Sequence, residues 1–471
     1  MRSIASSVAV RSLGAFSAQV PERVLIPGLD VGQPTKSFAL RNVTVIDGTG
    51  RPAVPQTTVV IAGNRLQSVA PAAQTSLASS VEVVDATGKF LIPGLWDMHT
   101  HLQTKSFPLF IPNGVTGVRA MGEEVLDPRQ SHVQLRAEIA SGKRLGPCLI
   151  APFRLNGWDG QGLPVPDPQR RWPNTHLIVT PEDGRDAVRA AVQEGSDFVK
   201  VRGVFSRNTF LAIAAEAKSR NIPLAGHVFQ PSVGEPLTLT DASNAGMASI
   251  EHGEHVRVYI RTVLGGPDGV GIDGLNVTQT AGLFDLFALL RRNGTWFCPT
   301  LTDTPRGVPI VSSDPRLRYF DPAQRKIWET QGVIPPDRAD VAARNYRGLL
   351  SITAAMHQAG VGLLAGTDVR SEFGMPGFWI HEELRQLVAA GLSSMEALQT
   401  ATFNSAKFLG LLGTVGTIEA GKLSEMVLLD ANPLDDITNT TKINMVFTGG
   451  NVYRRPALDA MLKAVEQSAQ I

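Results

Sequence analysis

Two histidines separated by a single residue, His99 and His101, are the side chains in this 471-residue chain best suited to chemistry. They come at the end of an apolar run with the composition of a buried strand. Residues two apart in a strand point to the same side, so the two imidazoles can bind one metal ion together. A pair of this kind also arises by chance in a long chain, so the metal interpretation needs support from the rest of the sequence.

Four other polar side chains also end short apolar runs. Lys200, His227, His252 and Asp368 each close a run rich in β-branched or small residues, which is typical of a buried parallel strand. In a (β/α)8 barrel the carboxyl ends of the strands meet at one rim and form the active site there. We therefore expect these side chains to converge with the histidine pair on one site.

The order of these residues resembles that of the metal-dependent amidohydrolase superfamily, in the branch with a metal-bridging lysine. The shared pattern is His-x-His after the first strand, lysine after the fourth, histidines after the fifth and sixth, and aspartate after the eighth. Residues 41–50 resemble the amino-terminal strand of the family, and residues 416–434 resemble its carboxyl-terminal signature, with Glu425 where aspartate is usual. The chain is similar to the imidazolonepropionase-like and Xaa-Pro dipeptidase-like branch, which includes dipeptidases acting on carboxyl-terminal proline or arginine and a mycotoxin amidase.

This resemblance implies a centre of two divalent metal ions. The implied ligands are His99, His101 and Asp368 for one ion and His227 and His252 for the other, with Lys200 bridging both. Zinc is the commonest metal for such nitrogen and oxygen donors, and manganese, iron and cobalt also fit them.

Lys200 needs a chemical change before it can bind metal, because an ammonium group has no lone pair to donate. Burial beside two cations favours the neutral amine, and carbon dioxide would convert that amine to a carbamate (N6-carboxylated lysine) that bridges both ions. The alternative is a structural lysine paired with an acid such as Asp197 or Glu251. Asp197 is an odd number of residues from Lys200 and should face the other side of the strand.

The chemistry implied by this centre is hydrolysis, with Asp368 and Lys200 as the catalytic residues. A metal-activated hydroxide would attack the substrate, and Asp368 would carry its proton to the leaving nitrogen. We expect cleavage of an amide-type C–N bond in a dipeptide, an N-acyl amino acid or a related small amide. The same metals could also hydrolyse an ester, lactone, carbamate or phosphotriester. A non-catalytic barrel homologue is a further alternative, which the complete set of ligands disfavours.

Several side chains near the same rim are candidates for substrate binding, because a guanidinium can clamp a carboxylate and an aromatic ring can cover an apolar group. They are Arg154, Trp158, Arg202, His255, Arg257, Tyr259 and His381. His255 is also consistent with a surface histidine, and His381 with a residue that steadies Asp368. The connections at 152–179, 253–283 and 301–348 are longer than a barrel needs, and we expect them to be loops that carry recognition.

Strand-like runs that alternate with helical patterns predict an α/β fold, a (β/α)8 TIM barrel over residues 93–412. After the strand that leads to His99, the barrel strands are expected at 114–119, 147–151, 198–201, 223–227, 248–252, 296–299 and 361–368. Residues 37–92 and 413–456 alternate apolar and polar positions, which favours one small discontinuous β-sandwich domain. Residues 457–471 predict a helix, and residues 1–36 a disordered or extended leader.

Composition narrows the range of partners. With 44 basic and 43 acidic residues, the chain offers no charge excess for nucleic acid or an anionic membrane. No apolar run approaches the roughly 20 residues that span a bilayer. We expect a small-molecule substrate and a cytoplasmic protein, with export through a processed leader as the alternative. A homo-oligomer is compatible with the sequence.

Overall fold

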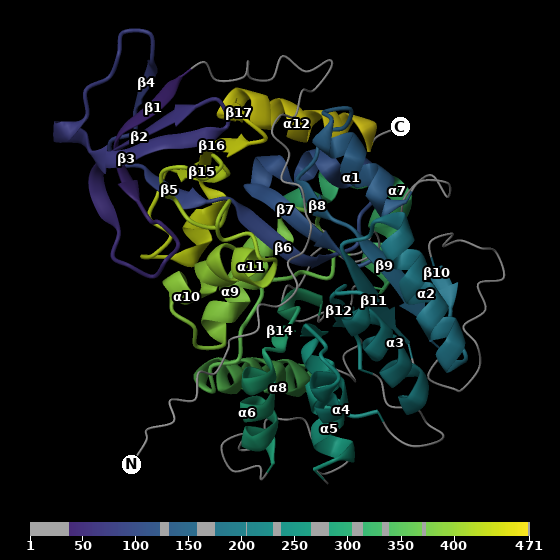
Figure 1. Cartoon of the computed structure of the whole chain (residues 1–471). Coiled ribbons are helices and arrows are strands. Elements are labelled where there is room, and N and C mark those ends of the chain that lie inside the picture. The colour runs from purple at the N-terminus through teal and green to yellow at the C-terminus, as the bar shows by residue number, and fades with distance from the viewer. Residues whose placement is uncertain are drawn as a thin grey trace, which may run out of the picture.

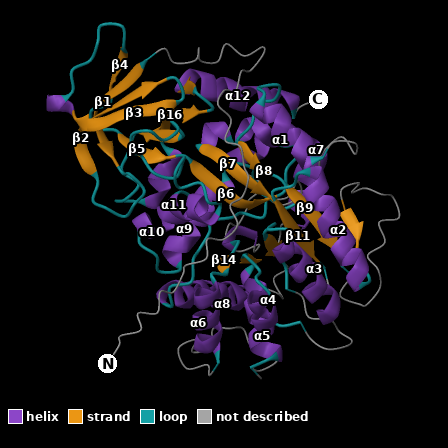
Figure 2. Cartoon of the chain, in the orientation of Figure 1, coloured by secondary structure: helices purple, strands orange, loops and turns teal. Residues whose placement is uncertain are grey.

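The structure is a computed structural model that describes residues 37–122, 131–157, 175–203, 205–228, 237–264, 282–303, 314–331, 339–369 and 374–469. The expected leader and Trp158 lie outside the described residues. The described part is an α/β fold in which parallel strands are flanked by helices, and a sheet built from both ends of the chain lies beside them (Figures 1 and 2).

Parallel strands hold the residues that the sequence singled out. One sheet contains, in order, β6 (Leu95–Thr100), β7 (Val115–Ala120) and β8 (Cys148–Ile150). A second contains, in order, β10 (Thr175–Leu177), β9 (Pro152–Asn156), β11 (Phe198–Arg202), β12 (Leu224–Gly226), β13 (Ser249–Glu251) and β14 (Trp296–Cys298). Every pairing in these two sheets is parallel, so the strands present their carboxyl ends on the same side.

Two features of the backbone link these sheets. Ala151 alone separates β8 from β9, so one chain segment pairs with β7 through its first half and with β11 through its second. Residues 361–369 lie between β14 and β6, because Leu363 bridges to Phe297 and Val369 bridges to Thr100. The predicted eighth strand is therefore present as isolated parallel bridges instead of a continuous strand.

The described parts of the three connections predicted as loops contain regular structure, so the expectation of loops was wrong there, and their role in recognition stays a prediction. Residues 152–156 form β9, in which Pro152 takes the first position and its missing N–H interrupts no pairing. The second connection begins with α5 (Gly253–Thr262), and the third contains α7 (Pro322–Gln331) and α8 (Ala339–Gln358). Alternating apolar residues in β9 and a helical apolar stripe in α5 explain why these segments fold.

The other helices mostly cover the parallel strands. They are α1 (His132–Ala140), α2 (Pro181–Glu194), α3 (Arg207–Ser219), α4 (Leu239–Asn244), α6 (Leu283–Asn293), α9 (Trp379–Ala389), α10 (Ser394–Thr400) and α11 (Phe403–Phe408). Helix α2 shows how their ends are encoded: Thr180 caps its first turn, and Gly195 ends it in the left-handed conformation. No described helix is both long enough and apolar enough to cross a membrane.

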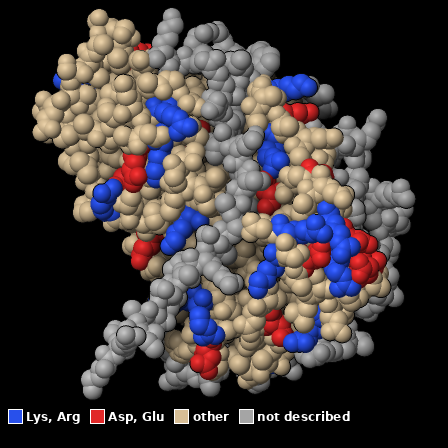
Figure 3. Space-filling model, viewed as in Figure 1, with Lys and Arg blue, Asp and Glu red and all other residues tan. Residues whose placement is uncertain are grey.

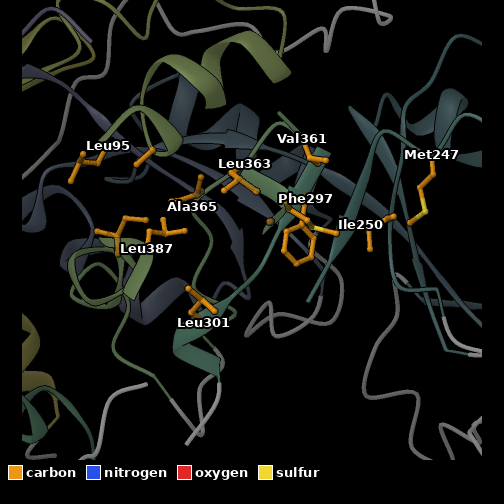
Figure 4. Packing of buried hydrophobic residues seen from close by; sticks show 14 of the residues in the cluster. Leu95, Met247, Ile250, Phe297, Leu301, Val361, Leu363, Ala365 and Leu387 are labelled. Carbon is orange, nitrogen blue, oxygen red and sulfur yellow. The ribbon is translucent and has the colours of Figure 1, made fainter. Parts of the chain in front are cut away.

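The largest apolar core lies between the strands and the helices. Figure 4 shows Ile250 of β13, Phe297 of β14 and Leu363 packed near one another, with Leu387 of α9 nearby. These residues belong to a single buried cluster. The strands are therefore held firmly beneath the ends that carry the ionisable residues. On the face of the molecule seen in Figure 3, basic and acidic side chains are interspersed.

Strands from both ends of the chain form a second β unit. Its sheet has the order β17 (Asn451–Arg454), β16 (Ile443–Thr448), β15 (Met426–Leu429), β5 (Phe90–Pro93), β1 (Phe38–Val45), β2 (Val54–Ala62), β3 (Arg65–Pro71), with β4 (Glu82–Asp85) also paired to β1. The antiparallel pair β5 and β15 joins the two ends. The discontinuous unit is thus present as one hydrogen-bonded sheet, and its closure into a sandwich stays a prediction. Helix α12 (Arg455–Ser468) follows β17 and starts two residues earlier than expected.

Candidate metal centre

The ends of three parallel segments bring four candidate ligands together. Nε2 of His99 lies 3.2 Å from Oδ1 of Asp368, and Nε2 of His101 lies 2.9 Å from the same oxygen. Nδ1 of His252 lies 3.9 Å from Oδ2 of Asp368. One ligand atom each from His99, His252 and Asp368 lies within 4.8 Å of the others. Donor atoms at this spacing can surround a single ion.

His227 reaches the cluster through His252. The two residues follow the neighbouring strands β12 and β13, and their Nε2 atoms are 2.9 Å apart. Gly226 makes this approach feasible: its φ is 132°, and a Cβ there would lie 2.2 Å from the carbonyl oxygen of Val201. The prediction that His227 and His252 lie together is therefore consistent with the geometry.

The far nitrogens of the histidine pair are held by acceptors, which orients the rings. Nδ1 of His101 lies 2.6 Å from the carbonyl oxygen of Gly122, so this nitrogen carries the proton. Nδ1 of His99 lies 2.9 Å from Oε2 of Glu251. In the neutral imidazole Nε2 of His101 then carries a lone pair, which faces Oδ1 of Asp368 at 2.9 Å. Two acceptors this close repel each other unless a cation lies between them, and so the donor set fits a metal ion.

Lys200 is buried in the middle of β11, and its Nζ has no hydrogen-bond partner among the described residues. Burial lowers the pKa of Lys200 to about 7, although Glu251 and Asp368 act in the opposite direction. Asp197 faces elsewhere, as predicted, because it accepts a hydrogen bond from the Ala151 amide at 2.7 Å. Neither Asp197 nor Glu251 forms a hydrogen bond with Lys200, and a pKa of about 7 makes the neutral amine accessible at neutral pH.

Burial keeps the clustered histidines in the form that binds metal. It lowers the pKa values of His99, His227 and His252 from the ordinary value for histidine, so neutral imidazoles predominate at neutral pH. Burial alone would raise the pKa of Asp368. Contacts with His99, His252 and His101 instead hold the pKa of Asp368 well below its usual range.

Strained backbone occurs at the same strand ends. His252, Asp368 and Thr300 have φ values of 68°, 49° and 49°, in the left-handed region that non-glycine residues seldom occupy. Such strain persists only where neighbouring contacts enforce it, and it is concentrated at functional sites. Asp97 provides one of these contacts, because it accepts hydrogen bonds from both the amide and the hydroxyl of Thr367.

Three of the predicted substrate-binding residues lie on elements that adjoin the cluster. Arg154 is buried in β9 opposite Lys200 in the strand register, and its Nε donates to Asn156 at 2.9 Å. Arg202 is the last residue of β11. His255 is buried in α5, with its ring centroid 5.2 Å from that of His227, so the interpretation as a surface histidine was wrong.

The remaining predicted substrate-binding residues have other contacts. The Tyr259 hydroxyl shares a hydrogen bond with Thr240, and the tyrosine belongs to the apolar core. Arg257 pairs with Glu254 on its own helix. Nδ1 of His381 shares a hydrogen bond with Thr440 at 2.9 Å, and the expected role of His381 toward Asp368 stays a prediction.

Buried charges that the sequence reasoning did not assign surround the ligands. Glu251, considered only as a partner of Lys200, binds His99 and forms an ion pair with Arg119 at 2.9 Å. Arg119 also donates to the carbonyl of Met98 at 2.6 Å. Glu383 of α9 accepts hydrogen bonds from the Leu301 and Thr302 amides. Two features of the sequence could have predicted these residues. Glu251 directly precedes His252, and Arg119 lies at the end of β7.

Comparison with known proteins agrees with this arrangement. Residues 90–453 match the model of the amidohydrolase family. The chain belongs to this family. A curated relative of this amidohydrolase, adenine deaminase 3 of Rhizobium meliloti (strain 1021), is 22% identical over 439 residues, which are 90% of this chain and 58% of that protein. The chain thus spans less than two thirds of the length of that relative.

Solved structures have the same fold as this amidohydrolase. A putative prolidase from Bifidobacterium longum is similar with a TM-score of 0.66 and 25% identity, covering 92% of this chain and 100% of that one. An ochratoxinase from A. niger has a TM-score of 0.64 at 19% identity, covering 90% and 96%. The comparisons therefore agree on the amidohydrolase family and on its fold.

Proposed function

We propose that this amidohydrolase is a binuclear metal-dependent enzyme that cleaves an amide-type C–N bond in a small molecule. The observation that carries the proposal is the pair of facing acceptors, Nε2 of His101 and Oδ1 of Asp368, beside the buried Lys200 amine, which has no hydrogen-bond partner among the described residues. Both features cost free energy in a merely structural cluster, and cations bound among them would offset that cost.

The proposed ligands are the six side chains that the resemblance implies. His99, His101 and Asp368 would hold one divalent ion and His227 and His252 the other, with Lys200 bridging as a carbamate. When bound, such ions lower the pKa of a water molecule and polarise the scissile carbonyl. Carbamate formation joins the Lys200 nitrogen to the carbon of carbon dioxide and releases one proton. The low pKa of Lys200 supplies the neutral amine that this addition requires.

Asp368 is the proposed proton carrier. Its carboxylate is buried and ionised, and it lies at the point where the histidines converge. It would accept a proton from the attacking water and deliver it to the nitrogen that leaves, because an unprotonated amide nitrogen is a poor leaving group. The strained backbone of Asp368 holds the carboxylate in one direction for both transfers.

The fold proposed for this chemistry is the complete (β/α)8 barrel. Residues 148–156 would act as one barrel strand, and residues 361–369 would complete the ring between β14 and β6. Such a ring gathers side chains from distant parts of the sequence at its carboxyl rim.

The proposed substrates are dipeptides and N-acyl amino acids, whose carboxylate could be bound by Arg154 or Arg202 on the strands that flank Lys200. Deamination of adenine is a second candidate, supported by the adenine deaminase relative. A panel containing dipeptides with carboxyl-terminal proline or arginine, N-acyl amino acids and adenine, assayed for product by mass spectrometry, separates these two classes. Turnover of an ester or a phosphotriester alone would contradict both.

Metal analysis tests the centre directly. We expect the purified protein to contain about two equivalents of a divalent metal such as zinc, to lose hydrolysis after dialysis against a chelator, and to regain it when metal is restored. Lys200→Ala should lose at least one equivalent, whereas Lys218→Ala, at an exposed position of α3, should keep both. Full activity in demetallated protein would disprove the proposal.

A further inference from the structure

Glu383 of α9 is a buried acid that lies outside the set of candidate ligands. Its Oε1 accepts a hydrogen bond from the Leu301 amide at 3.0 Å, and its Oε2 accepts one from the Thr302 amide at 2.9 Å. The Thr302 hydroxyl lies 3.0 Å from the same Oε2. The carboxylate therefore fixes the backbone at the point where the chain leaves β14.

The first consequence concerns His252. Thr300 immediately precedes the clamped residues, and its φ of 49° is one that a β-branched residue rarely adopts. The Thr300 hydroxyl lies 2.7 Å from Nδ1 of His252, which itself has a φ of 68°. By holding residues 301 and 302, Glu383 keeps Thr300 in the conformation that reaches His252.

The second consequence concerns Asp368. The Thr302 hydroxyl lies 3.1 Å from the carbonyl oxygen of Thr367, the residue directly before Asp368. The amide of Thr302 also donates to Glu383, so Thr302 connects Glu383 to the backbone next to Asp368. One carboxylate is therefore linked to the supports of two candidate ligands that come from different strands.

We propose that Glu383 is a positioning residue that sets His252 and Asp368 at the spacing that metal binding requires. This inference rests on the proposed function, since it assigns Glu383 a role toward the same centre. Glu383 acts through Thr300 and Thr302, and the proposal assigns it no contact with the substrate. Partners that orient metal ligands in this way typically change metal affinity by about 10–100-fold when they are removed.

The test compares two neighbouring glutamates of α9. Glu383→Gln replaces one acceptor oxygen with an NH2 group that must face an amide or hydroxyl donor. Glu382→Gln makes the same change at a residue whose contacts are ion pairs with Arg316 and Arg385. Metal-free samples are titrated with Zn²⁺ against a chromophoric chelator, after circular dichroism has shown that they are folded. We expect Glu383→Gln to weaken zinc binding at least tenfold and Glu382→Gln to leave it unchanged.

Thr300 supplies an independent pair of variants should Glu383→Gln not fold. Thr300→Val removes the hydroxyl that contacts His252 and should weaken zinc binding. Thr300→Ser keeps a hydroxyl at this position and should bind zinc as tightly as the unmodified protein. Hydrogen exchange of the peptide containing residues 300–302 in metal-free protein should increase in Glu383→Gln and stay unchanged in Glu382→Gln.

The outcomes separate this inference from the proposed function. If the unmodified protein binds zinc tightly and Glu383→Gln or Thr300→Val binds it equally well, the positioning role is wrong and the metal centre stands. If the unmodified protein binds no metal, the proposed function fails, and the positioning role fails with it.

Discussion

The carboxyl ends of the parallel strands and the sheet built from the chain ends differ in what they bury. The strand ends enclose Asp97, Lys200 and Glu251 among neutral histidines, with strained backbone at several positions. The chain-end sheet encloses a cluster that includes Leu40, Leu91 and Leu428, all without measurable exposure. Glu425, directly before β15, is a partly buried acid beside this sheet, and its Oε1 accepts a hydrogen bond from the Gly449 amide.

This difference separates two uses of burial. Burying an apolar side chain stabilises a fold by about 1.5–3 kcal/mol, whereas burying an uncompensated ionisable group costs free energy. The strand ends accept that cost at several positions in one small region, which is the expected signature of a site shaped for chemistry. Substitutions should therefore change activity without a loss of stability in the first region, and stability without a loss of activity in the second.

The largest effect is expected at the proposed proton carrier. Asp368→Asn keeps the size of the side chain but removes its basicity, and hydrolysis should fall by about a thousandfold. The matched change Asp430→Asn alters an acid that pairs with Lys89 at the chain-end sheet, and turnover should stay within about twofold because surface pairs contribute little. Steady-state kinetics on the best amide substrate measures both. Equal losses in the two variants would abolish the contrast between the regions.

Lys200→Met should separate activity from stability at a single position. Hydrolysis should be lost, while the free energy of unfolding of metal-free protein at pH 7 should rise by about 2–4 kcal/mol. The pKa of Lys200 is lowered by burial to about 7, so an unfolded chain gains a proton there that the folded chain binds weakly.

The direction of the Lys200 pKa shift determines how the gain in the free energy of unfolding depends on pH. This gain should be complete below pH 7 and should disappear as the pH rises toward 10.5, where the unfolded lysine also loses its proton. Urea unfolding at several pH values measures it, with Lys218→Met as the exposed control. A destabilised Lys200→Met variant would show that the amine contributes to the fold.

Local sequence patterns predicted most of the parallel strands and the strand ends at which the candidate ligands lie. Apolar runs that end in His99, Lys200 or His252 correspond to β6, β11 and β13, because a buried parallel strand has a recognisable composition. Period two also placed Asp197 on the face opposite Lys200. The family prediction is confirmed by the match over residues 90–453.

What sequence reasoning missed depends on contacts between distant residues. Glu383 is adjacent to Glu382 in α9. The local sequence does not indicate that Glu383 is buried whereas Glu382 forms ion pairs with arginines. The left-handed backbone of His252 and Asp368 could not be read either, because neither residue is glycine. The contact of His381 with Thr440 likewise joins residues 59 positions apart, and no local pattern indicates it.

In the chain-end sheet, Leu428→Ala should reduce stability while the folded enzyme stays active. The side chain is fully buried in β15 and lies opposite Leu91 of β5, so its removal leaves a cavity that costs about 2–5 kcal/mol. Val54→Ala, at a position 53% exposed in β2, is the matched control and should change stability by less than about 0.5 kcal/mol. Urea midpoints and the turnover of the folded fraction measure the two properties. Loss of turnover in folded Leu428→Ala would mean that the sheet shapes the site.

The smallest effect is expected at Glu425, the partly buried acid directly before β15. Burial raises the pKa of Glu425 to about 7, although its Oε1 accepts a hydrogen bond from the Gly449 amide at 2.8 Å. The unfolded chain loses this proton near pH 4.5, and the folded chain keeps it until about pH 7. Glu425 therefore does not lower the free energy of unfolding below pH 4.5. It lowers it progressively between pH 4.5 and pH 7, and by the full amount above pH 7.

Glu425→Gln removes this titration. Relative to the unmodified protein, the free energy of unfolding of the variant should therefore rise between pH 4.5 and pH 7, by about 1–2 kcal/mol in total. Glu419→Gln, at a half-exposed position of the same segment, should show no such growth, and a flat profile for Glu425→Gln would place the carboxylate in contact with water.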